Sequence, residues 1–403
     1  MTDKFLPAPQ QSQQSWGAVL AMSLAAFALV ASEFMPVSLL TPIAADLQIT
    51  EGQAGQGISV SGLFALLTSL FIASVAARVD RKLLLLCLTL LMIVSGAVVA
   101  FAPNYTLFMT GRALIGIAIG GFWSLSAATA MQLVPDDQVP RALAIVNGGN
   151  AMATVIAAPL GSFLGALIGW RGAFFCIVPV AAVAAVWLLL SLPAMRSQRN
   201  ATSGNVFRLM KSVPVALGMV AVSVFFMGQF MLFTYLRPFL ETVTHVSVSM
   251  LSLMLLVLGV AGFAGTFLIE ALLKNGLYRT LIAIPMLMAM IALALISFGG
   301  SAATTTVLLG FWGLVATAAP VGWWTWLART LPDDAEAGGG LMVAIIQLAI
   351  TTGATLGGLV FDLNGYQATF ELSAVLLVLA AVLAFWAWHT ASRVTLTKSN
   401  VAV

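Results

Sequence analysis

The sequence predicts an all-α polytopic membrane protein with twelve transmembrane helices in two pseudo-symmetric six-helix bundles. Three observations carry this prediction: the composition, the spacing of the apolar segments and a repeat at half the chain length. Of the 403 residues, 61% are hydrophobic and only 8% are charged, and the mean hydropathy is +1.05. Soluble domains carry about 25% charged residues, so most of this surface must face lipid.

Twelve apolar segments are long enough to cross a bilayer, which takes about 20 residues each. In the fourth segment Gly116 and Gly120 are four residues apart, a spacing that lets a neighbouring helix approach closely, although a chain with 35 glycines also produces it by chance. The segments cover residues 16–40, 56–77, 83–102, 105–133, 141–168, 172–192, 214–240, 248–273, 278–299, 303–330, 336–361 and 367–389.

The basic residues predict the orientation, because cytoplasmic loops of membrane proteins carry an excess of Lys and Arg. Of the 17 such residues, 14 fall on one side: Lys4, Arg78, Arg81, Lys82, Arg141, Arg196, Arg199, Arg208, Lys211, Lys274, Arg279, Arg329, Arg393 and Lys398. Both termini are therefore expected in the cytoplasm, which requires an even number of crossings. The first fifteen residues lack the features of a cleaved signal peptide, so the first segment is expected to remain as a helix.

The predicted helices and loops divide the chain into five regions. They are a cytoplasmic N-terminal tail (1–15), a six-helix bundle (16–192), a cytoplasmic linker (193–213), a second six-helix bundle (214–389) and a cytoplasmic C-terminal tail (390–403).

The two halves resemble each other in sequence. Val134-Pro-Asp-Asp137 follows the fourth segment, and Leu331-Pro-Asp-Asp334 follows the tenth, 197 positions later. At the same offset, Gly161 in the first half corresponds to Gly358 in the second. Pro-Asp-Asp is also a common loop composition. Matches that occur in the same order in both halves nevertheless indicate duplicated transporter halves around a central site.

A few ionisable residues lie well inside apolar segments, where burying a charge is costly and makes the residue a candidate for function, and two of them stand out. Glu33 lies seven residues before Leu40, and Arg112 lies seven residues after Tyr105. At 1.5 Å per residue both are expected about 10 Å below the outer boundary. Burial disfavours a charged Glu33 and a nearby Arg112 favours it, so the pair is a candidate for proton coupling. A permanent ion pair, or an Arg112 bonded to backbone carbonyls, is the structural alternative.

Polar and aromatic side chains in the middle of other segments are candidates for a substrate site, which needs a few polar groups among apolar walls. Amides and aromatic faces suit a flat heterocycle, and they suit a sugar equally well. The candidates are Asn147, Asn150, Gln229, Tyr235, Trp323 and Gln347.

Several functional classes are disfavoured by what the sequence lacks. There is no Walker loop, so direct use of ATP is not expected. Cys87 and Cys176 do not have metal-ligand spacing, and we expect no metal site, no cofactor and no enzymatic activity. A membrane-embedded sensor or enzyme would need an appended soluble domain or a clustered catalytic set, and neither is evident. A passive facilitator would keep the same fold without proton coupling.

Taken together, these features resemble the major facilitator superfamily, in particular its twelve-helix drug:proton antiporter branch. Arg112-x-x-x-Gly116 resembles the family's helix 4 motif, and Ala158-Pro-Leu-Gly161 resembles a relaxed form of its helix 5 motif. The loop Arg78-Val-Asp-Arg-Lys82 is similar to the family's basic loop but has Asp80 where glycine is usual, and Ala77 stands where the acidic residue is usual.

Within this branch the chain is similar to bacterial purine ribonucleoside efflux pumps, through stretches such as Glu33 to Pro42, Gly120 to Trp123 and Pro320 to Trp323. The resemblance implies a proton-coupled exporter of inosine-like nucleosides in the bacterial inner membrane. It implies alternating access and a monomer, with protons and lipid as the other partners and no nucleic acid. Sugar pumps share the first stretch, so a sugar or multidrug exporter is the alternative.

Overall fold

The computed structural model describes residues 15–76, 78–195, 206–331 and 335–401. Residues 1–14 of the predicted N-terminal tail, residues 196–205 of the predicted linker and residues 402–403 of the predicted C-terminal tail lie outside these ranges. The N-terminal half consists of α1 (Trp16–Leu47), α2 (Glu51–Ala76), α3 (Arg81–Ala100), α4 (Tyr105–Leu133), α5 (Val139–Phe175) and α6 (Ile177–Ser191). The C-terminal half consists of α7 (Val213–Thr234), α8 (Leu236–Thr242), α9 (Val248–Phe298), α10 (Ala302–Thr330) and α11 (Ala335–Val401).

Within the described ranges, ten helical segments are long and apolar enough to cross a membrane. Two of them, Arg141–Ser191 and Gly338–Thr390, contain 51 and 53 residues, far more than the 20 or so that one crossing takes. Each is broken at a glycine with positive φ, Gly169 at 75° and Gly365 at 79°, a backbone conformation that glycine adopts readily. Counting both limbs of each gives the twelve crossings expected from the sequence.

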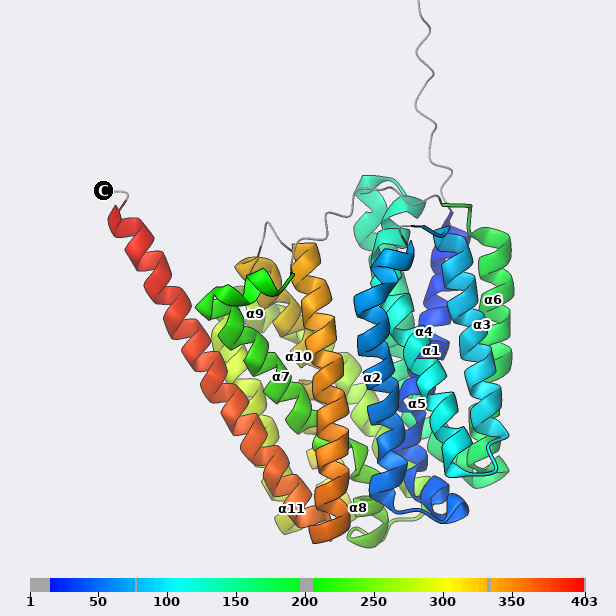
Figure 1. Cartoon of the computed structure of the whole chain (residues 1–403). Coiled ribbons are helices and arrows are strands. Elements are labelled where there is room, and N and C mark those ends of the chain that lie inside the picture. The colour runs from blue at the N-terminus through cyan, green and yellow to red at the C-terminus, as the bar shows by residue number, and fades with distance from the viewer. Residues whose placement is uncertain (1–14, 77, 196–205, 332–334, 402–403) are drawn as a thin grey trace, which may run out of the picture.

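The helix ends differ most from the predicted apolar segments in α1 and in α11. α1 continues to Leu47, beyond the predicted end at position 40. The last limb of α11 is helical as far as Val401, beyond the predicted boundary at 389. Figure 1 shows that the start of α1 and the end of α11 lie at the same end of the molecule. This end is referred to below as the inner end and the opposite one as the outer end, following the orientation that the basic residues predict.

The buried apolar side chains form two cores, one in each half. The first contains residues between Ala18 and Met195 together with Tyr235. The second contains residues between Val215 and Ala384 together with Val37, Ile58 and Ala158. These four exceptions mark where the halves touch. The contacts between the halves join α2 to α11, α5 to α9 and α1 to α8.

The glycine pair in α4 packs as its spacing predicts. A Cβ atom on Gly116 or Gly120 would collide with the backbone carbonyl of Ser61 or Ala65 in α2. The two helices therefore approach at backbone distance, which brings side chains of α4 close to the main chain of α2.

Candidate functional site

Arg112 is fully buried in the N-terminal half, and its guanidinium group is held by three backbone carbonyls. Its Nε donates to Gly57 at 3.1 Å, Nη1 donates to Ser32 at 2.8 Å, and Nη2 donates to Glu33 at 3.1 Å. Nη2 also donates to the Ser61 hydroxyl at 3.2 Å. An intramembrane cation needs such partners because there is no water to solvate it. Arg112 thus ties α4 to α1 and α2.

One of these carbonyls is available because of a proline. Pro36 lies inside α1 and has no N–H, so the carbonyl four residues earlier, that of Ser32, lacks its helical donor. Arg112 supplies the missing hydrogen bond. The sequence places Glu33 and Arg112 at one depth in the same half, and these contacts confirm it.

Glu33 is 6% exposed, and its carboxyl group lies between the two halves. The charge of Arg112 acts on it from the N-terminal half, and the side chain of Gln347 in α11 lies near it from the C-terminal half. Among the described residues, the ion pairs are Arg171–Asp46, Arg237–Glu241 and Lys274–Glu270. Arg112 therefore contacts the main chain of Glu33, as the structural alternative anticipates, and leaves its carboxyl group available to the other half.

Aromatic rings cross the same interface beside Glu33. Phe34 in α1 stacks on Phe230 of α7, with ring centroids 5.8 Å apart and planes inclined by 26°. Phe34 also meets Phe233 edge-on at 6.4 Å. Because Phe34 follows Glu33 and Phe230 follows Gln229, these contacts bring the central parts of α1 and α7 together. Flat aromatic faces thus lie close to the candidate proton site.

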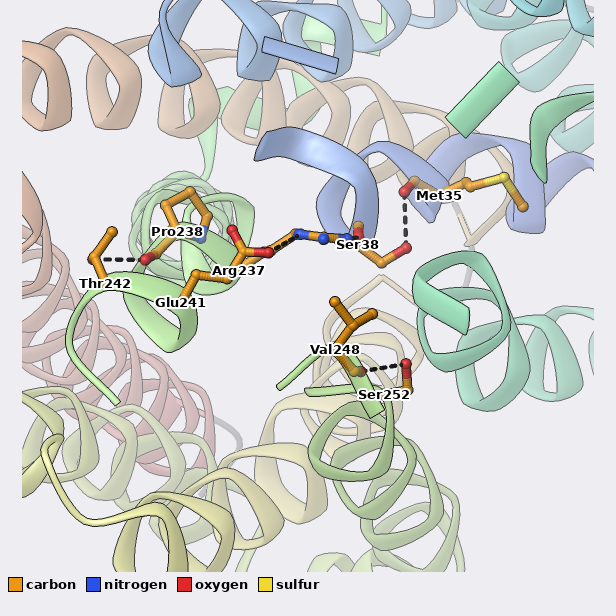
Figure 2. Close-up of polar contacts among 8 residues, drawn as sticks. All are labelled: Met35, Ser38, Arg237, Pro238, Glu241, Thr242, Val248 and Ser252. Carbon is orange, nitrogen blue, oxygen red and sulfur yellow. Dashed lines mark hydrogen bonds and ion pairs between the residues drawn. The ribbon is translucent and has the colours of Figure 1, made fainter. Parts of the chain in front are cut away.

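Toward the outer end, Arg237 of α8 links the halves. Figure 2 shows its side chain lying between Glu241 and Ser38. Its Nε donates to the Glu241 carboxylate at 2.8 Å, and its Nη1 donates to the backbone carbonyl of Ser38 in α1. Pro42, four residues after Ser38, leaves that carbonyl without a helical donor. Arg237 is only 6% exposed, so this contact is sealed from solvent.

Asp362 in α11 makes the second outer contact. Its carboxylate accepts a hydrogen bond from the Thr50 hydroxyl at 2.6 Å and another from the backbone N–H of Gly52 at 3.0 Å. Gly52 lies in the first turn of α2, where the backbone N–H groups are unpaired and the helix dipole favours a negative charge. A residue of the C-terminal half thus caps a helix of the N-terminal half.

Further along the same pair of helices, Thr351 and Thr355 of α11 bond to Ser59 of α2. Thr351 donates to the Ser59 carbonyl at 3.2 Å, and Thr355 donates to the Ser59 hydroxyl at 2.9 Å. The polar contacts between the halves thus run from Gly52 to Ser59, which is the outer part of α2. The halves are joined at the outer end in this conformation.

The other candidates for substrate contact occupy different environments. Asn147 is exposed and donates to the Leu143 carbonyl of its own helix at 2.9 Å, while Asn150 is half-buried. Tyr235 is fully buried; its hydroxyl donates to the Ala354 carbonyl at 2.8 Å, and its ring stacks on Phe361. Trp323 is buried within the C-terminal half and packs against Phe225. Tyr235 and Trp323 are therefore part of the packing in this conformation.

Two buried amide oxygens have no hydrogen-bond partner among the described residues. They are the Oε1 atoms of Gln229 and Gln347. A buried polar atom without a partner is expensive, so each is a candidate acceptor for a donor group of a ligand. Gln347 in α11 approaches the interface between the halves, and Gln229 lies in α7 next to Phe230.

Five residues of this region were not predicted from the sequence: Phe34, Phe230, Phe233, Arg237 and Asp362. One signal in the sequence points to Arg237 in retrospect. A proline inside a membrane helix frees the carbonyl four residues earlier, and Pro42 marks Ser38 as a carbonyl in need of a donor. Asp362 gives no such signal, because its partners are 310 or more positions away.

The sequence matches the profile of the Major Facilitator Superfamily over residues 22–349. It is 64% identical over 379 residues to the "Transcription regulatory protein OpdE" of Pseudomonas aeruginosa, covering 93% of this chain and 94% of that one. It is 40% identical over 371 residues to the "Purine ribonucleoside efflux pump NepI" of Salmonella enteritidis, covering 92% of this chain and 94% of that one.

Among solved structures, the fold is similar to a bacterial homologue of the human lysosomal transporter Spinster. The inward-facing, unoccupied form of that protein superimposes with a TM-score of 0.75 at 16% identity, covering 94% of this chain and 98% of that one. The occupied inward-facing form gives 0.74 at 17% identity, covering 95% and 98%. These matches show that the fold is shared.

Proposed function

Because this chain belongs to the Major Facilitator Superfamily, and is therefore a multi-pass membrane transporter rather than an enzyme, we propose that it exports purine ribonucleosides from the cytoplasm in exchange for protons. The observation that carries the proposal is the position of Glu33. This buried carboxyl group lies between the two halves, beside the fixed charge of Arg112 and within reach of Gln347. It has no ion-pair partner among the described residues.

Alternating access explains how such a carboxyl group couples transport to protons. When the outer contacts through Ser38, Gly52 and Ser59 are closed, Glu33 is reached from the inner end. When the halves rock apart at the outer end, Gln347 moves away from Glu33, and protons arrive from the outer side. Arg112 stays with Glu33 throughout, because its hydrogen bonds are all within the N-terminal half. We place the protein in the bacterial inner membrane, with both termini in the cytoplasm, acting as a monomer.

A purine nucleoside suits the chemistry beside Glu33. Its base is flat and can stack on aromatic faces such as those of Phe34, Phe230 and Phe233. Its ring N–H and ribose hydroxyls are donors for the unpaired amide oxygens of Gln229 and Gln347. The pump that shares 40% identity is named for purine ribonucleosides. The proposed substrate contacts are Asn147, Asn150, Gln229 and Gln347, with Tyr235 and Trp323 as wall residues that this conformation keeps buried.

A second candidate function comes from the relative with 64% identity, whose name describes a role in transcription for that protein. A transporter changes the cytoplasmic concentration of its substrate, and such a change alters transcription without any contact with nucleic acid. The two functions are separable by experiment. If the protein regulates transcription through export, Glu33→Gln removes both effects. If it regulates transcription directly, Glu33→Gln removes export and leaves transcription unchanged.

The test is uptake of radiolabelled inosine into inside-out vesicles with an imposed proton gradient. We expect accumulation by the natural protein and none by Glu33→Gln, which should still equilibrate inosine without a gradient. Glu371→Gln, which removes an exposed carboxylate from α11, is the matched control and should behave like the natural protein.

Each contrary result has a definite meaning. Transport of sugars or drugs but not inosine, by protein shown to be folded, rejects the nucleoside assignment. Inosine transport that never exceeds equilibrium identifies a passive facilitator. Gradient-driven accumulation by Glu33→Gln rejects Glu33 as the coupling residue.

A further inference from the structure

A cavity of about 550 Å³ opens at the inner end of the C-terminal half. It lies where α9 breaks into two limbs at Gly276, beside the end of α10 and Trp388 in the last limb of α11. It is separate from the site around Glu33. Its walls are formed by Lys274, Gly276, Leu277, Tyr278, Arg279, Arg329, Thr330 and Trp388.

The walls carry three cations and no carboxylate. Lys274 forms an exposed ion pair with Glu270 at 3.1 Å. No described carboxylate forms an ion pair with Arg279 or Arg329, and Arg329 donates a long hydrogen bond of 3.5 Å to the Leu273 carbonyl. Two guanidinium groups therefore line one cavity without a counter-charge from the described chain. Guanidinium groups bind phosphate oxygens in a bidentate manner, more specifically than an ammonium does.

The cavity also borders on surface that faces lipid. Tyr278 and Trp388 form a stacked pair, with ring centroids 6.2 Å apart and planes inclined by 13°. The ring of Phe385 meets Trp388 edge-on at 6.3 Å, and Phe385 is 48% exposed. On α9, Leu272 is exposed two residues before Lys274. Apolar side chains suited to acyl chains thus flank a cationic cavity at the membrane boundary.

We propose that this cavity binds the phosphodiester headgroup of an anionic phospholipid of the inner leaflet, with its acyl chains lying along Leu272 and Phe385. Arg279 and Arg329 hold the phosphate, and the Tyr278–Trp388 pair forms the wall beside the glycerol. Cationic pockets between membrane helices on the cytoplasmic side bind anionic headgroups through the same chemistry. The flanking apolar surface distinguishes a lipid from free phosphate, which gains nothing from it.

The experiment measures binding to the purified full-length protein in a neutral detergent. The probe is dihexanoyl phosphatidylglycerol. The comparison ligands are dihexanoyl phosphatidylcholine, which has no net charge, and glycerol phosphate, which has no acyl chains. We expect the phosphatidylglycerol to bind at least tenfold more tightly than either. Arg279→Gln with Arg329→Gln should weaken its binding by about 10- to 30-fold.

Two control variants isolate the role of the cavity. Arg208→Gln removes an exposed cation that does not line the cavity and should bind like the natural protein. Arg279→Lys with Arg329→Lys keeps the charge and should retain binding within about fivefold. If the double glutamine variant does not elute as a folded monodisperse protein, the two single glutamine variants take its place, each with a loss of about fivefold.

Three results would overturn the proposal. Equal binding of phosphatidylcholine would show a general detergent or lipid surface. Glycerol phosphate binding as tightly as phosphatidylglycerol would show a site for a water-soluble anion. Unchanged binding by the glutamine variants would place the lipid elsewhere on the protein.

Discussion

Arg237 donates a hydrogen bond to the backbone carbonyl of Ser38, which Pro42 leaves without a helical donor. Arg112 does the same for Ser32, the carbonyl freed by Pro36. The two arginines thus complete the same helix, α1, from opposite sides of the molecule. Arg112 comes from the N-terminal half and fixes α1 within its own bundle. Arg237 comes from the C-terminal half, so its hydrogen bond must break whenever the halves separate at the outer end.

We predict that Arg237→Gln favours opening at the outer end. A hydrogen bond from a charged group contributes about 1.5 kcal/mol, so its loss should raise outer-end exposure about tenfold. The measurement is the rate at which a membrane-impermeant maleimide labels Ser59→Cys in intact cells, with Cys87 and Cys176 both replaced by serine.

Arg171→Gln is the control for this prediction, because Arg171 lies near the same end but bonds to Asp46 and Ala102 of its own half. It should leave the labelling rate unchanged. An equal effect of both substitutions would mean that Arg237 acts only on stability. Labelling only in inside-out vesicles would show that the orientation of the protein is opposite to the predicted one.

The hydrogen bond between Arg112 and Ser32 should be visible in a double-mutant cycle. Arg112→Met leaves buried carbonyls unpaired, and we expect it to lower the free energy of unfolding in detergent by about 3 kcal/mol. Pro36→Ala restores an N–H group that can pair with Ser32. In that background the same Arg112→Met change should lower the free energy of unfolding by about 1 kcal/mol less. If the effects of the two substitutions on the free energy of unfolding are strictly additive, the Ser32 carbonyl does not depend on Arg112 for its hydrogen bond.

Gly52 should be essential for closing the outer end. A Cβ atom there would overlap the Asp362 carboxylate and lie 2.6 Å from the Gly358 carbonyl, so Gly52→Ala should keep α2 and α11 apart. We expect the initial rate of inosine uptake to fall at least tenfold at equal protein level. Gly148→Ala, where nothing lies within 4 Å of the added atom, should transport within about twofold of the natural protein. Normal uptake by Gly52→Ala would mean that this close approach is not part of the cycle.

The unpaired amide oxygens of Gln229 and Gln347 should contribute to affinity. Gln229→Leu and Gln347→Leu each remove one acceptor, and the loss of one hydrogen bond of about 1.4 kcal/mol weakens binding about tenfold. The dissociation constant for inosine, measured by equilibrium binding to purified protein, checks this. Gln367→Leu, at an exposed position of α11, should bind like the natural protein. Unchanged affinity in both test variants would move the substrate away from these two residues.

Much of the fold follows from the sequence because few backbone structures can cross a bilayer. A spanning segment must satisfy its own backbone hydrogen bonds, so long apolar segments become helices. The glycine pair of α4 packs as its spacing predicts, and Glu33 and Arg112 share one depth because helical rise converts sequence position into height. The breaks at Gly169 and Gly365 fall between predicted segments, 141–168 and 172–192 in the first half and 336–361 and 367–389 in the second, and each uses the positive φ that glycine adopts readily.

The candidate site was predicted only in part, because it depends on contacts between residues far apart in the chain. Glu33 and Arg112 can be identified from the sequence because burying a charge inside a membrane costs free energy. Gln347 can be identified because its position in its apolar segment places it near the middle of the membrane. It does not show that Gln347 faces Glu33, that Phe34 meets Phe230, or that Asp362 caps α2. Each of these pairs joins the two halves, and their meeting depends on how two independent cores are docked.

The sequence by itself determined the membrane environment, the helical crossings, their expected orientation and the buried charges. Hydrophobicity and helical rise are local properties, and they are readable one segment at a time. Only the tertiary structure decided that the halves are joined at the outer end, that Arg112 is bound by carbonyls, and that Arg279 and Arg329 line one cavity. Those outcomes depend on side chains converging from different helices, and no local property of the chain specifies which helices become neighbours.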